Sequence, residues 1–200
     1  MATAGVAMTP ALIGCVADPV TGEQMLIFMS EEDEIAVDKQ QAPHQFSSDY
    51  GEVQDPVLNA YLKQVGDDLA SRSHRPHMPY DYKAVNATYV NAYTFPGGSM
   101  AATRGILLEM ETEAELAALL GHEIGHVNAR HTAERMSRGM LTQAVVAGAS
   151  VVVATSEYSE YGGLLSSLGG IGAGALLAKY SRDNEREADA LGMEYMTRAG

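Results

Sequence analysis

The pentapeptide HEIGH at residues 122–126 places the tightest constraint on what this chain can fold into. On a helix, residues four positions apart lie one turn apart on the same face, so His122 and His126 can point their imidazoles at one place. Glu123 is rotated by about 100° from His122 and flanks that place without binding there. The motif therefore predicts a helix that carries two metal ligands beside a carboxylate able to act as a general base.

Apolar residues recur on the same helix and form a stripe with the two histidines at its border, which places them at the edge of a core. Gly121 and Gly125 each disfavour a helix by up to about 1 kcal/mol relative to alanine. Two glycines in one motif therefore predict that another segment packs closely here. The stripe consists of Leu116, Leu119, Leu120, Ile124 and Val127.

A catalytic zinc ion takes three protein ligands and leaves one position for water, so HEIGH leaves one ligand to be found. The longer motif HExxHxxGxxH would supply a third histidine, but positions 129 and 132 hold Ala and Thr. His131 does not fit that spacing, and we expect it to lie at the surface. The remaining source is a carboxylate from another helix.

The segment DNEREADALGMEYM offers that carboxylate on a helix predicted from Arg182 to Ala199. Glu185 and Asp189 share one face with small residues that would let a neighbouring helix approach closely. Acids on an inward face are costly unless they are paired. A metal ion for Glu185 and a histidine N–H for Asp189 would pair both. The alternative is a surface helix whose acids form salt bridges with Arg182 and Arg186.

The composition limits which metal ligands and which binding partners this chain can have. A net charge of −13 argues against nucleic acid, because phosphate binding needs clustered Lys and Arg. Cys15 is the single cysteine, so any metal site must use His and carboxylates. The string LIGC at 12–15 resembles a bacterial lipobox, which would lipidate Cys15 and attach the protein to a membrane. An unstructured tail over residues 1–22 with an incidental cysteine is the alternative.

The rest of the chain predicts an α+β fold with a mainly helical core and a small antiparallel sheet at the edge of the active-site cleft. We expect the HEIGH helix to pack on the helix that carries Glu185 and Asp189. A solvated surface helix is expected to start at the acidic run 31–34, and a second helix is expected to be capped by Asp55-Pro56. Strands are expected within 82–95 and from 99. A further helix is expected over 111–136, with a capping box at Thr112 and Glu115.

Two further segments carry open interpretations. His74 and His77 lie in the loop string SRSHRPHMPY, and we expect them at the surface. Residues 140–180 are apolar and rich in glycine, but the runs 141–154 and 164–178 are shorter than the roughly 20 residues of a membrane helix. Buried helices or a mobile cover over the cleft are favoured, and a membrane hairpin is the alternative.

Three strings together resemble the gluzincin metallopeptidases of peptidase family M48, which includes HtpX, the BepA-type periplasmic proteases and the mitochondrial Oma proteases. The strings are NAYTFPGG at 91–98, TRGILLEMETEAELAALLGHEIGHVNARH at 103–131 and YSRDNEREADALGMEYMTRAG at 180–200. They occur in the order of the family's catalytic core. The resemblance implies a zinc metallopeptidase domain over residues 23–200.

The resemblance also implies roles for individual residues: zinc bound by His122, His126 and Glu185, catalysis by Glu123, and support of a ligand by Asp189. It implies that the strand at Asn91 and Ala92 edges the cleft and pairs with extended substrate, with ordinary strand packing as the alternative. The family's oxyanion-stabilising His and Arg lie further downstream. Because the chain ends at Gly200, we expect a domain truncated at its C-terminus and assign no oxyanion residue.

The expected function is zinc-dependent endopeptidase activity on unfolded or misassembled proteins of the cell envelope, in the periplasm. One alternative is a chaperone or binding module that keeps zinc for stability without turnover. A second is an integral membrane protease that uses residues 140–180 as a hairpin.

Overall fold

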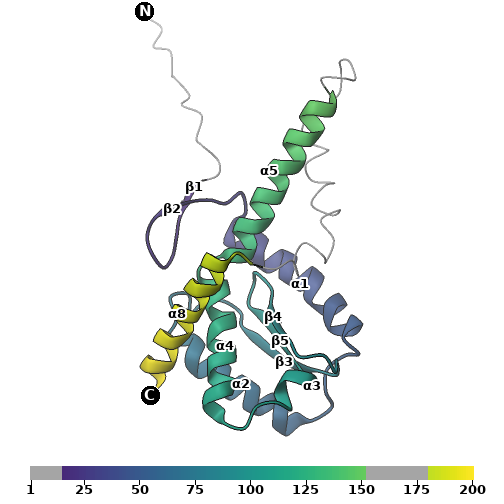
Figure 1. Cartoon of the computed structure of the whole chain (residues 1–200), viewed down its shortest axis with the longest axis vertical. Coiled ribbons are helices and arrows are strands. Elements are labelled where there is room, and N and C mark those ends of the chain that lie inside the picture. The colour runs from purple at the N-terminus through teal and green to yellow at the C-terminus, as the bar shows by residue number, and fades with distance from the viewer. Residues whose placement is uncertain (1–14, 152–179) are drawn as a thin grey trace, which may run out of the picture.

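The computed structural model describes residues 15–151 and 180–200, in which a three-stranded sheet is held among helices (Figure 1). This mixture agrees with the predicted α+β class. The strands are β1 Cys15–Ala17, β2 Gln24–Leu26, β3 Asp81–Val85, β4 Ala92–Thr94 and β5 Ser99–Thr103. The helices are α1 Glu31–Ser48, α2 Pro56–Ala70, α3 Arg104–Leu107, α4 Glu113–Asn128, α5 His131–Val151 and α8 Arg182–Ala199.

The sheet has the order β3-β5-β4 and is mixed, so the prediction of a purely antiparallel sheet is wrong. β5 pairs with β3 in parallel and with β4 in antiparallel orientation. After β3 the chain crosses to the far edge of the sheet, and a tight turn at Pro96-Gly97 then returns it between the two strands. The amide of Gly98 closes this turn by donating to the carbonyl oxygen of Phe95 at 3.0 Å. β4 is consequently an edge strand.

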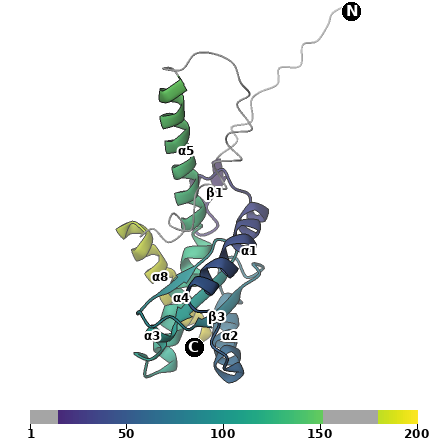
Figure 2. The same ribbon diagram turned by 90° about the vertical axis from the view of Figure 1, so that its right-hand side faces the viewer.

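The two faces of the sheet pack against different helices. Tyr82 and Met100 pack with apolar residues of α2, α4 and α8. Tyr93 and Ala101, which are paired across β4 and β5, point the other way and pack with residues of α1 and α5. Because side chains alternate along each strand, the sheet contributes residues to one hydrophobic core on each of its faces. Figure 2 shows α1 crossing the sheet on the face opposite α4.

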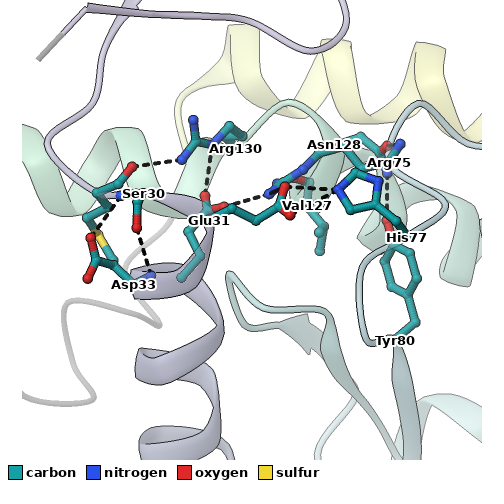
Figure 3. A network of polar contacts seen from close by, with 11 residues as sticks. Ser30, Glu31, Asp33, Arg75, His77, Tyr80, Val127, Asn128 and Arg130 are labelled. Atoms are coloured by element: carbon teal, nitrogen blue, oxygen red, sulfur yellow. Dashed lines mark hydrogen bonds and ion pairs between the residues drawn. The ribbon is translucent and has the colours of Figure 1, made fainter.

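Helix α1 is not the solvated surface helix that its acidic start predicted. Ser30 and Asp33 form a capping box at its N-terminus, which explains why an acidic run begins the helix. Glu34 and Asp38, however, are buried. Glu34 lies between Arg75 and Arg130, at 2.7 Å and 3.0 Å from their guanidinium nitrogens. Both arginines belong to the network of polar contacts in Figure 3. The acidic run therefore supplies a buried ion-pair network.

The helix predicted over 111–136 is interrupted, and the prediction of one continuous helix is wrong. α4 ends at Asn128, Arg130 adopts a left-handed backbone with a φ of 55°, and α5 starts at His131. A left-handed conformation costs a residue with a side chain about 1–2 kcal/mol. The Arg130 guanidinium offsets this cost by donating to Glu34 and to the carbonyl oxygen of Met29.

The N-terminal region differs from the expected unstructured tail within the part that the structure describes. Residues 15–17 form β1, which pairs with β2 in an antiparallel hairpin. The turn is held by Asp18, whose amide donates to the carbonyl oxygen of Glu23 at 2.8 Å. The lipobox-like residues before Cys15 and the apolar run 164–178 lie outside the described residues. Among the described helices, none combines the length and apolar character needed to cross a bilayer.

Candidate metal centre

Helix α4 holds the two motif histidines at the border between a core and a cleft. The predicted capping box is present: the Thr112 hydroxyl accepts from the Glu115 amide, and the Glu115 carboxylate accepts from the Thr112 amide. Leu116, Leu120 and Ile124 on the same helix are buried. With its apolar stripe fixed in this core, α4 directs the imidazoles of residues 122 and 126 toward α8.

Helices α4 and α8 cross at backbone contact because small residues face each other. A Cβ atom added to Gly125 would lie 2.8 Å from the carbonyl oxygen of Ala188. A Cβ atom added to Gly192 would lie 2.9 Å from the backbone nitrogen of His122. Larger residues at these positions would separate the helices. The close crossing sets the first turns of α8 beside the two histidines.

The side chains of His122, His126 and Glu185 converge. The Nε2 atoms of the two histidines are 3.0 Å apart. The carboxylate oxygens of Glu185 lie 3.5 Å from Nε2 of His122 and 3.9 Å from Nε2 of His126. Ligands arranged tetrahedrally around zinc lie about 3.4 Å from one another, given metal–ligand distances near 2.05 Å. The three donors are therefore spaced for one ion, with nitrogen and oxygen ligands that zinc accepts.

Each histidine also has a partner for its other ring nitrogen. Nδ1 of His122 lies 2.8 Å from Oδ1 of Asp189 on α8. Nδ1 of His126 lies 2.8 Å from Nδ1 of His131, whose Nε2 lies 3.2 Å from the Glu187 carboxylate. The prediction that His131 lies at the surface is wrong, since only 2% of it is exposed. The chain reversal at Arg130 brings His131 beneath His126.

The environment of His126 keeps its ring neutral. Burial lowers its pKa to about 2, and the neighbouring His122 and His131 act in the same direction. The ring of Tyr180 stacks on that of His126, with 3.8 Å between the centroids and 16° between the planes. The Tyr180 hydroxyl hydrogen-bonds to that of Thr132 at 2.7 Å. A neutral imidazole in a fixed plane is the form that binds a metal ion.

Glu123 is almost completely buried although it borders the same cleft. Burial raises its pKa to about 8, and the nearby charge of Glu185 adds to the effect. A carboxyl group whose pKa lies near neutrality is able both to accept and to release a proton. A cation at the adjacent centre would favour the carboxylate and lower this pKa.

The centre opens into a cleft of about 560 Å³. Asn91 and Ala92 line it together with the histidines, Glu123 and Glu185. Across β4 and β5, the amide of Thr103 donates to the carbonyl oxygen of Asn91, and the amide of Phe95 donates to that of Ser99. Because backbone groups alternate in direction along a strand, those of Ala92 and Thr94 point away from β5, along the outer edge of the sheet.

Two tyrosines that line the cleft are bonded to one buried carboxylate. The hydroxyls of Tyr89 and Tyr93 donate to the two carboxylate oxygens of the buried Asp49, at 2.8 Å and 2.5 Å.

The sequence did not identify Asp49, Tyr180 or Glu187 as residues that support the site. Each acts through a partner at least forty positions away, so the local pattern gives no signal for it.

The other histidine pair lies apart from this centre. His77 is exposed in the loop after α2 and pairs with Glu31 at 3.0 Å, as expected for a surface residue. His74 is half-buried, and its Nδ1 lies 2.8 Å from the hydroxyl of Tyr195 on α8. The two side chains thus have different partners, which does not favour a shared metal ion.

A model of peptidase family M48 matches residues 56–200 of the chain. A putative beta-barrel assembly-enhancing protease of Vibrio cholerae is 31% identical over 152 residues, which are 74% of this chain and 31% of the relative. The Metalloprotease YcaL of Escherichia coli is 35% identical over 122 residues, 61% of this chain and 46% of the relative. The mitochondrial metalloendopeptidase OMA1 of Schizosaccharomyces pombe is 31% identical over 163 residues, 80% of this chain and 46% of the relative.

The chain therefore spans about a third of the length of the first relative and just under half of the other two. The matched region begins at the start of α2 and includes both α4 and α8.

Proposed function

Because this chain belongs to peptidase family M48, we propose that it is a zinc-dependent endopeptidase. The observation that carries the proposal is the convergence of His122, His126 and Glu185 within 4.8 Å of one another, in a cleft that Glu123 also lines. His122, His126 and Glu185 are the proposed zinc ligands. Asp189 is the proposed hydrogen-bond partner that fixes the ring of His122.

The proposed ligand set suits a catalytic ion better than a structural one. Two neutral imidazoles and one carboxylate leave a site with net positive charge and room for a fourth ligand. Zinc held there would polarise the scissile carbonyl and lower the pKa of a water molecule toward about 7. The buried neutral state of His126 supports this set, since no proton has to leave that ring before it binds.

Glu123 is the proposed general base. Its carboxylate takes a proton from the attacking water and delivers it to the amine that leaves when the peptide bond breaks. The burial of Glu123 supports this role, because a carboxyl group shielded from bulk water holds a proton between the two transfers.

Asn91 and Ala92 are the proposed substrate-binding residues. The outward backbone groups of Ala92 can pair with an extended peptide. Asn91, whose carbonyl oxygen accepts from Thr103, lines the adjacent cleft that then receives the scissile bond. This mode reads the backbone more than the side chains, so it suits unfolded or misassembled protein substrates.

The proposed cellular setting is supported by the relatives. Those named beta-barrel assembly-enhancing proteases support a role in the quality control or assembly of envelope proteins in the periplasm. The lipobox-like string at 12–15 supports attachment to a membrane through a lipidated Cys15.

The proposal is tested by comparing the parent with Glu123→Gln for cleavage of unfolded casein, with Glu32→Gln as the control. Glu32 is an exposed acid on α1, so its substitution removes the same charge far from the cleft. We expect Glu123→Gln to retain zinc and lose at least about 100-fold in rate, while Glu32→Gln cleaves like the parent. A chelator should abolish cleavage and added zinc should restore it. A parent that binds zinc but never cleaves would instead favour the chaperone function.

A further inference from the structure

His131 and Glu187 have no role in the mechanism above, yet His131 contacts the proposed zinc ligand His126, and Glu187 contacts His131. We propose that they are positioning residues that fix the ring and tautomer of His126, and the inference rests on the proposed function. The side chain of His131 is 1% exposed and that of Glu187 is 34% exposed. Three groups, the Glu187 carboxylate, the His131 ring and the His126 ring, thus form a line that runs from the edge of the protein to the centre.

The contacts in this line determine where each proton lies. The Nε2 atom of His126 faces His122 and Glu185, so it must keep its lone pair free for a metal ion. The proton of a neutral His126 is then on Nδ1 and is donated to Nδ1 of His131, 2.8 Å away. His131 must therefore be the Nε2–H tautomer, and it donates to Glu187 at 3.2 Å. With the protons placed in this way, every ring nitrogen of His126 and His131 has a partner, and no other placement of the protons gives the same result.

The backbone around His131 is built to hold it there. His131 follows directly on Arg130, whose left-handed conformation ends α4 and turns the chain back under His126. The Arg130 side chain is held by the buried Glu34 carboxylate at 3.0 Å and by the carbonyl oxygen of Met29 at 2.8 Å. Figure 3 shows Arg130 in this network. The position of His131 is thus anchored to α1, which lies outside the part of the chain that the family model matches.

The two proposed histidine ligands are supported in different ways from the same helix. His122 contacts a carboxylate of α8 directly, through Asp189. His126 lies deeper, and His131 bridges the distance to Glu187 on α8. One helix thereby supplies a ligand, Glu185, and an orienting carboxylate for each histidine. Partners of this kind commonly change metal affinity by about 10–100-fold.

A pair of variants with the same shape separates positioning from packing. Asn and Leu side chains have nearly the same size, but the Asn amide oxygen can accept the Nδ1–H of His126 and Leu cannot. We expect His131→Leu to lose about 10–100-fold in zinc affinity and His131→Asn to stay closer to the parent. Glu187→Ala should also weaken zinc binding, whereas Glu194→Ala, which removes an acid further along α8, should not.

The experiment measures zinc affinity by competition with a chromophoric chelator on the full chain. It also records long-range ¹H–¹⁵N spectra of the imidazoles in the zinc-loaded parent, which need no variant. We expect His131 as the Nε2–H tautomer and His126 as the Nδ1–H tautomer.

Equal zinc affinity of the Leu and Asn variants, or a His131 ring protonated on Nδ1, overturns this inference while leaving the proposed function in place. A parent chain that binds no zinc overturns both.

Discussion

The crossing of α4 and α8 offers a sharp test, because one added methyl group acts on both stability and metal binding. In Gly125→Ala the new Cβ lies 2.8 Å from the carbonyl oxygen of Ala188 and 3.0 Å from its Cα, whereas ordinary contact begins at 3.4 Å. Both obstacles are backbone atoms, so no side chain can move aside. The helices must separate by several tenths of an ångström, and Glu185 moves with α8 away from the two histidines.

The expected loss of stability follows from two opposing effects. Replacing glycine inside a helix by alanine stabilises it by up to about 1 kcal/mol. Overpacking of a close contact costs about 1–3 kcal/mol, and the upper part of this range, about 2–3 kcal/mol, applies here because the obstacles are backbone atoms. The net destabilisation is about 1–2 kcal/mol, which lowers the melting temperature of a domain of this size by about 2–8 °C.

The assay is thermal unfolding with and without a chelator, together with zinc affinity from chelator competition. Gly139→Ala on α5 is the matched control, since its Cβ meets no atom of the described residues within 4 Å. We expect Gly139→Ala to raise the melting temperature and to leave zinc binding unchanged. If Gly125→Ala is as stable as Gly139→Ala and binds zinc like the parent, the close crossing of the two helices does not set the position of Glu185.

Three further predictions concern charge and metal binding. In the folded metal-free protein the pKa of Glu123 is about 8, against 4.5 ordinarily, so the free energy of unfolding should fall by about 1.4 kcal/mol per pH unit as the pH rises from 5 to 8. Denaturant unfolding at several pH values should find this slope absent in Glu123→Gln. Glu34→Ala should cost about 3–5 kcal/mol by the same method, since it removes the carboxylate that pairs with the buried guanidinium groups of Arg75 and Arg130 and leaves Arg75 with Glu31. Zinc at 100 times its dissociation constant should add about 2.7 kcal/mol, and a chelator should remove this gain.

The elements that local chemistry determines could be predicted from the sequence. Asp55 accepts from the amides of Val57 and Leu58, with Pro56 in the first turn of α2, as the Asp-Pro pair indicated. The bounds of α8 match the predicted helix for the same reason, because Ser181 and Asn184 form its cap within four residues. Signals of this kind need no knowledge of the rest of the fold.

The break between α4 and α5 could not be predicted, because the sequence around Arg130 contains no helix breaker. The break depends on contacts with Met29 and Glu34, which are about a hundred positions away. The error about His131 has the same origin, since a continuous helix would have turned this residue away from His126. The parallel pairing of β3 and β5 is likewise set by the path of the chain between them and not by a pattern within either strand.

We have proposed that His122, His126 and Glu185, which come from helices far apart in the chain, bind one zinc ion together. Metal analysis by inductively coupled plasma mass spectrometry, on the parent and on Glu185→Ala after dialysis against metal-free buffer, tests it most directly. We expect about one zinc ion per parent chain and little in the variant, with the fold of the variant retained. Equal zinc in the two proteins, or none in the parent, would contradict it.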